Sequence, residues 1–244
     1  MKLFFRDRQE ALIPFNNYRL AAMRPTIKAL FITVAAFNTL LLIPDMIQIT
    51  GARAVAVAAL RVVYTLGVLF TLFWTIRLKT FRAYAALVTV LEAAVIAVFL
   101  TVFLLYPAPD FTIQVLGMMV IIMLVYLAPN SWANMNAVAL AGIVSFFICT
   151  LFVVRGTDAG RITAGMIYLV VVSALCAIFS LHIRAYQYRE YVSRSDLMRD
   201  YVTDPLTRLG NRVMLEEEAA KWMDRTMKYG LPLSLIVMDV DNMK

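Results

Sequence analysis

Long apolar runs separated by short polar stretches dominate the first 181 residues of the chain. Each run is close to the ~20 residues that a helix needs to cross the ~30 Å hydrocarbon core of a bilayer. The runs are too long and continuous for the alternating strands of a membrane barrel. We therefore predict a six-helix transmembrane bundle, with spans at 27–43, 54–76, 83–105, 111–128, 133–154 and 162–181.

Composition supports this interpretation, because 62% of the 244 residues are hydrophobic and only 16% are charged. The net charge of +7 comes from Lys and Arg that flank the apolar runs, so it favours a lipid bilayer and not a nucleic acid as the partner. Cys149 and Cys176 lie within apolar runs and form neither a disulfide framework nor a metal-binding spacing.

The distribution of basic residues predicts the orientation in the membrane. With segment 1–26 in the cytoplasm, thirteen Lys and Arg fall on the inner side and three on the outer side. This bias follows the positive-inside rule, and an even number of spans returns the C-terminal part to the cytoplasm. Segment 1–26 is basic, and it is expected to be either an amphipathic piece on the inner membrane surface or a loosely ordered tail.

Two ionisable residues, Arg61 and Glu92, lie within the predicted spans. Charges inside a membrane are costly unless compensated, so both are candidates for a sensory role. Helical side chains lean toward their own N-terminus, and the two helices run in opposite directions. At 1.5 Å per residue the two backbones lie about 8–10 Å apart in depth, which disfavours a direct pair. We expect Arg61 to extend to the outer surface, which makes Glu92 the better sensing or binding candidate.

Residues 182–203 contain no Gly or Pro and are rich in charge. They predict a connector helix, about 30 Å long, that leaves the membrane without a break. The heptad pattern is imperfect, so both a dimeric coiled coil and a solvated single helix remain open.

Residues 204–244 have the pattern of an α/β domain. An apolar stripe predicts a helix over 212–229, which Gly230 and Pro232 terminate. The apolar run 233–240 predicts a central strand ending in Asp-Val-Asp at 239–241. Ligand sites in α/β folds lie at the carboxyl ends of strands, and paired carboxylates there can hold Mg²⁺.

The two ends of this segment together resemble the opening of a GGDEF domain, the catalytic module of bacterial diguanylate cyclases. The stretch Asp-Pro-Leu-Thr-Arg-Leu-Gly-Asn-Arg at 204–212 matches the family's Asp-x-Leu-Thr-x-Leu-x-Asn-Arg. The run at 235–244 matches its strand ending in Asp-(Ile/Val)-Asp-x-Phe-Lys. The expected fold is therefore mostly α: a transmembrane sensory domain at 27–181, a connector helix at 182–203, and the first helix and strand of a nucleotide-cyclase-like α/β domain at 204–244.

The resemblance also implies site residues. Asp239 would bind Mg²⁺ through its carboxylate and Val240 through its backbone carbonyl. The residues near the GTP triphosphate would be Asn242, Met243 and Lys244.

At the start of the domain, Asp204 and Arg212 would fix the turn that joins it to the connector. The chain departs from the family at Arg208, where Gly is usual, at Val213, where a second Arg is common, and at Met243, where Phe is usual.

The implied activity is that of a membrane-bound diguanylate cyclase, which condenses two GTP into cyclic di-GMP with release of pyrophosphate. It would act as a homodimer in the bacterial cytoplasmic membrane, with both termini in the cytoplasm. The sequence ends at Lys244, before the Gly-Gly-Asp/Glu-Glu-Phe signature, so we expect residues 1–244 alone to be inactive. The alternatives are a degenerate GGDEF receptor and a non-enzymatic six-span sensor or transport protein.

Overall fold

The computed structural model describes residues 14–75, 77–78, 80–153 and 158–238. The chain divides into two compact units, the first ending at Gln187 and the second beginning at Tyr188. In the first unit a short helix over residues 14–22 precedes the apolar helices. These are α2 (Arg24–Leu40), α3 (Leu42–Gln48), α4 (Ala52–Thr75), α5 (Phe81–Leu105), α6 (Phe111–Leu127), α7 (Trp132–Val153) and α8 (Ala159–Val202), of which α8 continues into the second unit.

The predicted spans fall on these helices, the first of them on both α2 and α3, and the predicted end residues 76 and 154 lie outside the described residues. Within the described ranges, five helical stretches are long and apolar enough to cross a membrane: Arg24–Gln48, Ala52–Thr75, Phe81–Leu105, Trp132–Phe152 and Ala159–Val202. The predicted span at 111–128 coincides with α6, which is apolar but shorter than the other five. The first unit is therefore the bundle of a multi-pass membrane protein.

The first span continues further than the sequence pattern predicted. We ended it at residue 43 because Pro44 is a helix breaker. In the structure α2 breaks at Leu41, and α3 then carries the chain on to Gln48. Proline lacks an amide donor and clashes with the carbonyl four residues before it. Pro44 therefore interrupts the helix at Leu41 but does not end it. The extension brings Asp45 into the bundle, where it is buried.

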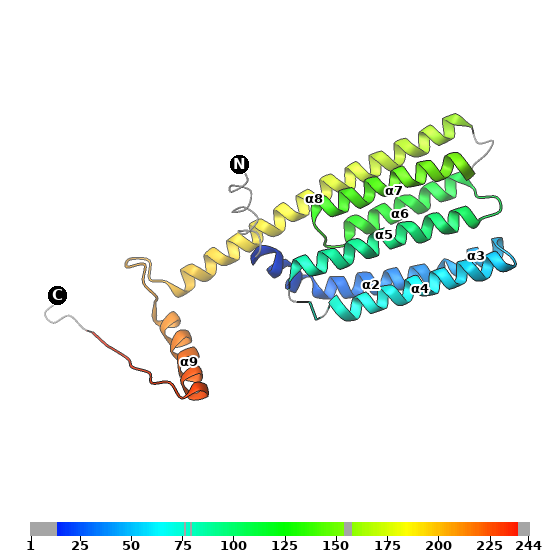
Figure 1. The fold of residues 1–244 in the computed structure, drawn as a ribbon. Coiled ribbons are helices and arrows are strands. Elements are labelled where there is room, and N and C mark those ends of the chain that lie inside the picture. The colour runs from blue at the N-terminus through cyan, green and yellow to red at the C-terminus, as the bar shows by residue number, and fades with distance from the viewer. Residues whose placement is uncertain (1–13, 76, 79, 154–157, 239–244) are drawn as a thin grey trace, which may run out of the picture. The chain divides into compact units, whose positions relative to one another are not determined.

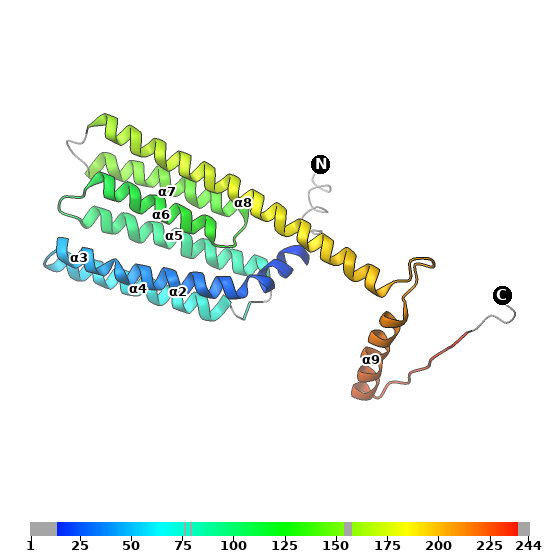
Figure 2. The same ribbon diagram turned by 180° about the vertical axis from the view of Figure 1, so that it is seen from behind.

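The helices pack side by side (Figures 1 and 2), with α4 against both α2 and α5, and α7 against both α5 and α6. One core cluster joins α2, α4 and α5 around Val68 and Tyr84, and another joins α5–α8 around Phe103 and Phe146. Many large apolar side chains face outward, among them Val63, Leu66, Phe70, Leu140, Phe152 and Phe179. An apolar outer surface of this extent suits contact with lipid.

One glycine permits a close helix approach in the second cluster. A Cβ atom at Gly165 of α8 would lie 2.9 Å from the ring of Phe111 and 2.9 Å from Val115, both on α6. Small residues allow backbones to approach closely where helices pack within a membrane. The absence of a side chain at Gly165 therefore lets α8 lie against α6.

The second unit contains the end of α8, a turn, and α9 (Arg212–Tyr229). The predicted connector is confirmed as a helix, since α8 runs without a break from Ala159 to Val202. The predicted helix over 212–229 is also confirmed. Asn211 caps its first turn, and Gly230, with a φ of 63°, terminates it in the left-handed conformation.

The predicted strand over 233–240 does not form in its described part, which ends at Met238. Its side chains are exposed, including Ile236 and Val237 at 81% and 83%. A β-strand is stabilised by hydrogen bonds to a neighbouring strand, and the described ranges contain no strand to provide them. The apolar run is therefore extended but unpaired here.

Candidate functional site

A buried polar network surrounds Arg61 in the first unit. Its Nε donates to Asp45 Oδ2, and its Nη1 donates to Asn38 Oδ1 at 3.1 Å. Asn38 Nδ2 in turn donates to the Arg61 carbonyl at 3.0 Å and to Thr65 Oγ1 at 2.9 Å. On the other side of the ion pair, the Tyr106 hydroxyl donates to Asp45 Oδ1 at 2.5 Å. Four segments of the chain therefore meet at one charge pair inside the bundle.

The expectation that Arg61 extends to the surface is wrong. Its side chain does reach toward the end of the bundle at which α4 begins, because it contacts Asp45 near the end of α3. However, both side chains are buried, exposing 9% and 2% of their surfaces. The ion pair offers Arg61 a partner within the bundle, so the guanidinium does not need to reach water.

Glu92 lies in a second polar network, formed by α5 and the turn before α7. Asn130 Nδ2 donates to Glu92 Oε2 at 2.8 Å and to Thr89 Oγ1 at 2.9 Å. Asn134 Nδ2 also donates to Thr89 Oγ1 at 2.9 Å. Glu92 and Asn130 are both buried, with Asn130 fully so. The network joins the first turn of α7 to the middle of α5.

The second oxygen of Glu92, Oε1, is buried and has no hydrogen-bond partner among the described residues. A small cavity of about 40 Å³, lined mostly by apolar side chains, lies beside Glu92 and Tyr64. Arg61 belongs to the other network, as the difference in depth predicted. Glu92 is therefore a buried acidic group with one oxygen that has no hydrogen-bond partner among the described residues, and its role in sensing stays a prediction.

The partners of both charges were not predicted from the sequence. Asp45 lay beyond the predicted end of the first span, and Asn130 lay in a turn without charges. The signal was present in the sequence, since Asn38, Asp45 and Asn130 are polar residues within or beside apolar runs. Such residues need partners in a membrane, but their pairing depends on how the helices pack.

In the second unit, Asp204 organises the turn after α8. Its Oδ1 accepts hydrogen bonds from the Thr207 amide at 2.8 Å, the Thr207 hydroxyl at 2.9 Å and the Leu206 amide at 3.1 Å. The bonds from Thr207 hold the pKa of the Asp204 carboxyl below its ordinary value of 3.8. Asp204 therefore stabilises this turn, and its role in joining the connector to a catalytic domain stays a prediction.

Asn211 links the turn to the helices on both sides. Its Nδ2 donates to the Tyr201 carbonyl at 2.8 Å, and its Oδ1 accepts from the first amides of α9, at 2.9 Å from Val213. Arg212 Nε donates to Glu216 Oε1 at 2.9 Å, within α9, and the predicted role of Arg212 in the turn stays a prediction. Arg208 has a φ of 61°, in the left-handed region that favours glycine.

The residues predicted to bind metal and nucleotide lie outside the described residues. These are Asp239, Val240, Asn242, Met243 and Lys244. Within the described ranges, no three His, Cys, Asp or Glu side chains come close enough together to hold a metal ion. The described residues of the second unit therefore do not test the predicted metal site.

Comparison with models of known protein families gives no match, and no curated protein is similar to the chain.

Proposed function

We propose that the chain joins a membrane-embedded regulatory bundle to a diguanylate cyclase domain that begins at Asp204. The observation that carries the proposal is the turn at 204–211, where Asp204 Oδ1 accepts hydrogen bonds from the amide and hydroxyl of Thr207 and where Asn211 caps α9. These are the positions at which the sequence resembles the GGDEF family. The resemblance therefore falls on residues whose hydrogen bonds stabilise the turn after α8.

The turn also explains one departure from the family. The chain has Arg208 where the family usually has Gly, and Arg208 adopts the positive φ that glycine accommodates without strain. A backbone with the same conformation therefore accounts for the family's preference at this position, which supports the proposed alignment of residues 204–212.

In the proposed domain, the oxygen atoms available as metal ligands at the end of the apolar run 233–240 suit Mg²⁺. The carboxylate of Asp239 and the carbonyl of Val240 provide hard oxygen ligands, which Mg²⁺ prefers. Bound there, Mg²⁺ would stabilise negative charge on the GTP phosphates during attack by a 3′-hydroxyl on an α-phosphate. Backbone groups of Asn242 and Met243, with the Lys244 ammonium, would hold the triphosphate.

The proposed reaction requires two copies of the domain, because each half-site holds one GTP and each nucleotide attacks the other. The unbroken helix α8 leads from the bundle to the turn at Asp204, so a change in the bundle could alter how two copies meet. The positive-inside bias supports a cytoplasmic location for Asp204, where GTP and Mg²⁺ are available.

A chimera tests the proposal. Residues 1–244 are fused in frame to the remaining part of a GGDEF domain from an active cyclase, and cyclic di-GMP is measured after addition of GTP and Mg²⁺. We expect product from the chimera and none from its Asp239→Asn variant. The matched control is Asp224→Asn, which neutralises an exposed carboxylate of α9 and should leave activity unchanged. A folded chimera that makes no product, or one that is indifferent to Asp239→Asn, would contradict the proposal.

A further inference from the structure

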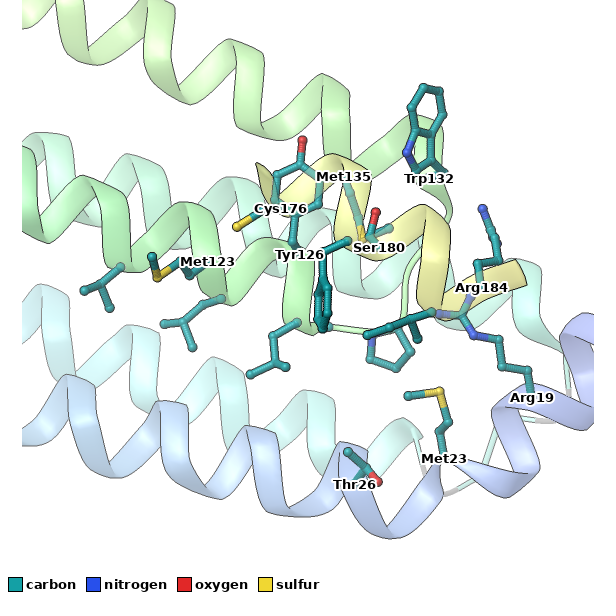
Figure 3. Close-up of a pocket in the computed structure, with 17 residues that line it drawn as sticks. Arg19, Met23, Thr26, Met123, Tyr126, Trp132, Met135, Cys176, Ser180 and Arg184 are labelled. Carbon is teal, nitrogen blue, oxygen red and sulfur yellow. The ribbon is translucent and has the colours of Figure 1, made fainter. Parts of the chain in front are cut away.

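A cavity of about 380 Å³ lies within the first unit, at the end of the bundle where α2 begins (Figure 3). Its walls come from the start of α2, the end of α6, the start of α7 and residues 176–184 of α8. The volume is within the range of about 300–1,000 Å³ that small-molecule sites occupy. Most of the lining is apolar, including Met123, Leu124 and Phe179. Met123 and Phe179 are also exposed, so the cavity opens onto the surface of the bundle.

Two arginines lie at one end of this cavity. Figure 3 shows the side chains of Arg19 and Arg184 beside one another, with Met123 toward the other end. Arg19 is 7% exposed, and its Nε and Nη1 atoms are buried without a hydrogen-bond partner among the described residues. The described lining contains no Asp or Glu.

This arrangement is costly in an empty cavity. A buried guanidinium without an opposite charge loses its hydration and receives no ion pair in return. Burial, together with the positive charge of Arg184, lowers the pKa of Arg19 to about 10. An anion between the two guanidinium groups would offset their repulsion and provide charge-assisted hydrogen bonds to Arg19.

We propose that this cavity binds an amphipathic anion, an acyl chain with a carboxylate or phosphate head group, whose head lies between Arg19 and Arg184. The chain would lie along Met123, Leu124 and Phe179. A small inorganic anion would satisfy the arginines but leave the apolar part of the cavity unfilled. An acyl chain satisfies both parts, and the apolar surface of the bundle places the cavity where such chains are abundant.

The position of the cavity also gives the ligand a regulatory role, which rests on the proposed function. Residues Cys176, Phe179, Ser180, Ile183 and Arg184 all belong to α8, the helix that continues to the turn at Asp204. A ligand head group that draws Arg184 toward Arg19 would favour one position of α8 over another. Binding itself does not depend on cyclase activity, so the two proposals can fail separately.

Trp132 lines the cavity and provides a direct binding signal. In a Trp74→Phe, Trp222→Phe background it is the sole tryptophan, since the chain has three. The full chain is placed in nanodiscs of phosphatidylcholine and titrated with dibromostearate, whose bromines quench tryptophan fluorescence at short range. We expect saturable quenching. Arg19→Gln should weaken the apparent affinity about tenfold or more, because a charge-assisted hydrogen bond is lost.

Two further variants separate binding in the cavity from general effects. Lys28→Gln removes an exposed positive charge near the start of α2, outside the cavity, and should leave the affinity unchanged. Ser180→Leu keeps both arginines but fills the cavity, and should weaken binding as strongly as Arg19→Gln. Equal quenching in the Arg19→Gln and Lys28→Gln proteins would overturn the proposal.

The source of the ligand is distinguished by nanodiscs that contain brominated lipids. Quenching by brominated phosphatidylglycerol, reduced in Arg19→Gln, identifies a membrane lipid with an anionic head group. Quenching by dibromostearate alone identifies a free fatty acid. Equally strong quenching by brominated phosphatidylcholine would show that the cavity contacts any acyl chain, which contradicts a site selective for anions.

Discussion

Replacing Arg61 by methionine tests the structural role of the buried ion pair. The substitution keeps most of the side-chain volume but removes the charge that faces Asp45. It also removes the donor to Asn38 Oδ1. Within the network, the Asp45 carboxylate would then keep only the hydrogen bond from the Tyr106 hydroxyl among the described residues.

The size of the effect follows from burial. Because Asp45 exposes 2% of its side chain and Arg61 9%, neither charge is compensated by water when its partner is removed. Removing one partner of such a pair costs about 3–5 kcal/mol, whereas replacing both by apolar residues of similar volume is often nearly neutral. We therefore expect Arg61→Met to destabilise the bundle by about 3–5 kcal/mol, and Asp45→Leu/Arg61→Met to recover most of that loss.

The assay is unfolding of the full chain in mixed micelles with increasing SDS, followed by loss of helical circular dichroism. Arg53→Met serves as the control, because Arg53 is exposed at the start of α4 and should tolerate the change. The reasoning is refuted if Arg61→Met is no more destabilising than Arg53→Met. It is also refuted if the double variant loses the sum of the two single effects.

Three further predictions concern glycine packing and the turn at Asp204. Gly165→Ala should destabilise the bundle by about 1–3 kcal/mol in the same assay, because its Cβ would lie 2.9 Å from α6 side chains. Gly67→Ala, whose Cβ would meet no atom within 4 Å, should be neutral or stabilising, and the reverse order would contradict this packing. Arg208→Gly should stabilise the turn by about 1 kcal/mol by removing the left-handed strain, seen as slower hydrogen exchange of the Thr207 amide; faster exchange would argue against strain at this residue. The lowered pKa of Asp204 means that its contribution to the turn is complete above 3.8 and is lost as pH falls through the lower folded value. Protection of the Thr207 amide should therefore persist at pH 3.8, and a midpoint of loss above 3.8 would contradict the assignment.

Local signals explain which elements could be predicted from the sequence. The bounds of α9 match the prediction at both ends, because Asn211 and Gly230 are caps whose effect depends only on neighbouring residues. The connector was predictable for a similar reason, since residues 182–202 offer no Gly or Pro to interrupt α8. The positions of the apolar spans followed from their length and composition alone.

Contacts between distant residues could not be predicted in the same way. The partner of Arg61 is 16 residues away, and Asn130 is 38 residues from Glu92, so both pairings depend on which helix faces lie together. Arg19 lay in a segment that we assigned to a tail or a surface helix, although it is buried against α8. The apolar run at 233–240 was predicted as a strand from its local pattern alone. A strand also needs a neighbouring strand, which lies elsewhere in the sequence.

Topology is the most direct test of the account, because the proposed cyclase domain must begin in the cytoplasm. Green fluorescent protein, which is fluorescent on the cytoplasmic side, and alkaline phosphatase, which is active on the outer side, are each fused after Asp204 and after Ala108. We predict fluorescence at Asp204 and phosphatase activity at Ala108, since Ala108 lies in the turn between α5 and α6. Phosphatase activity at Asp204 would place the turn outside the cell, away from GTP, and would contradict the account.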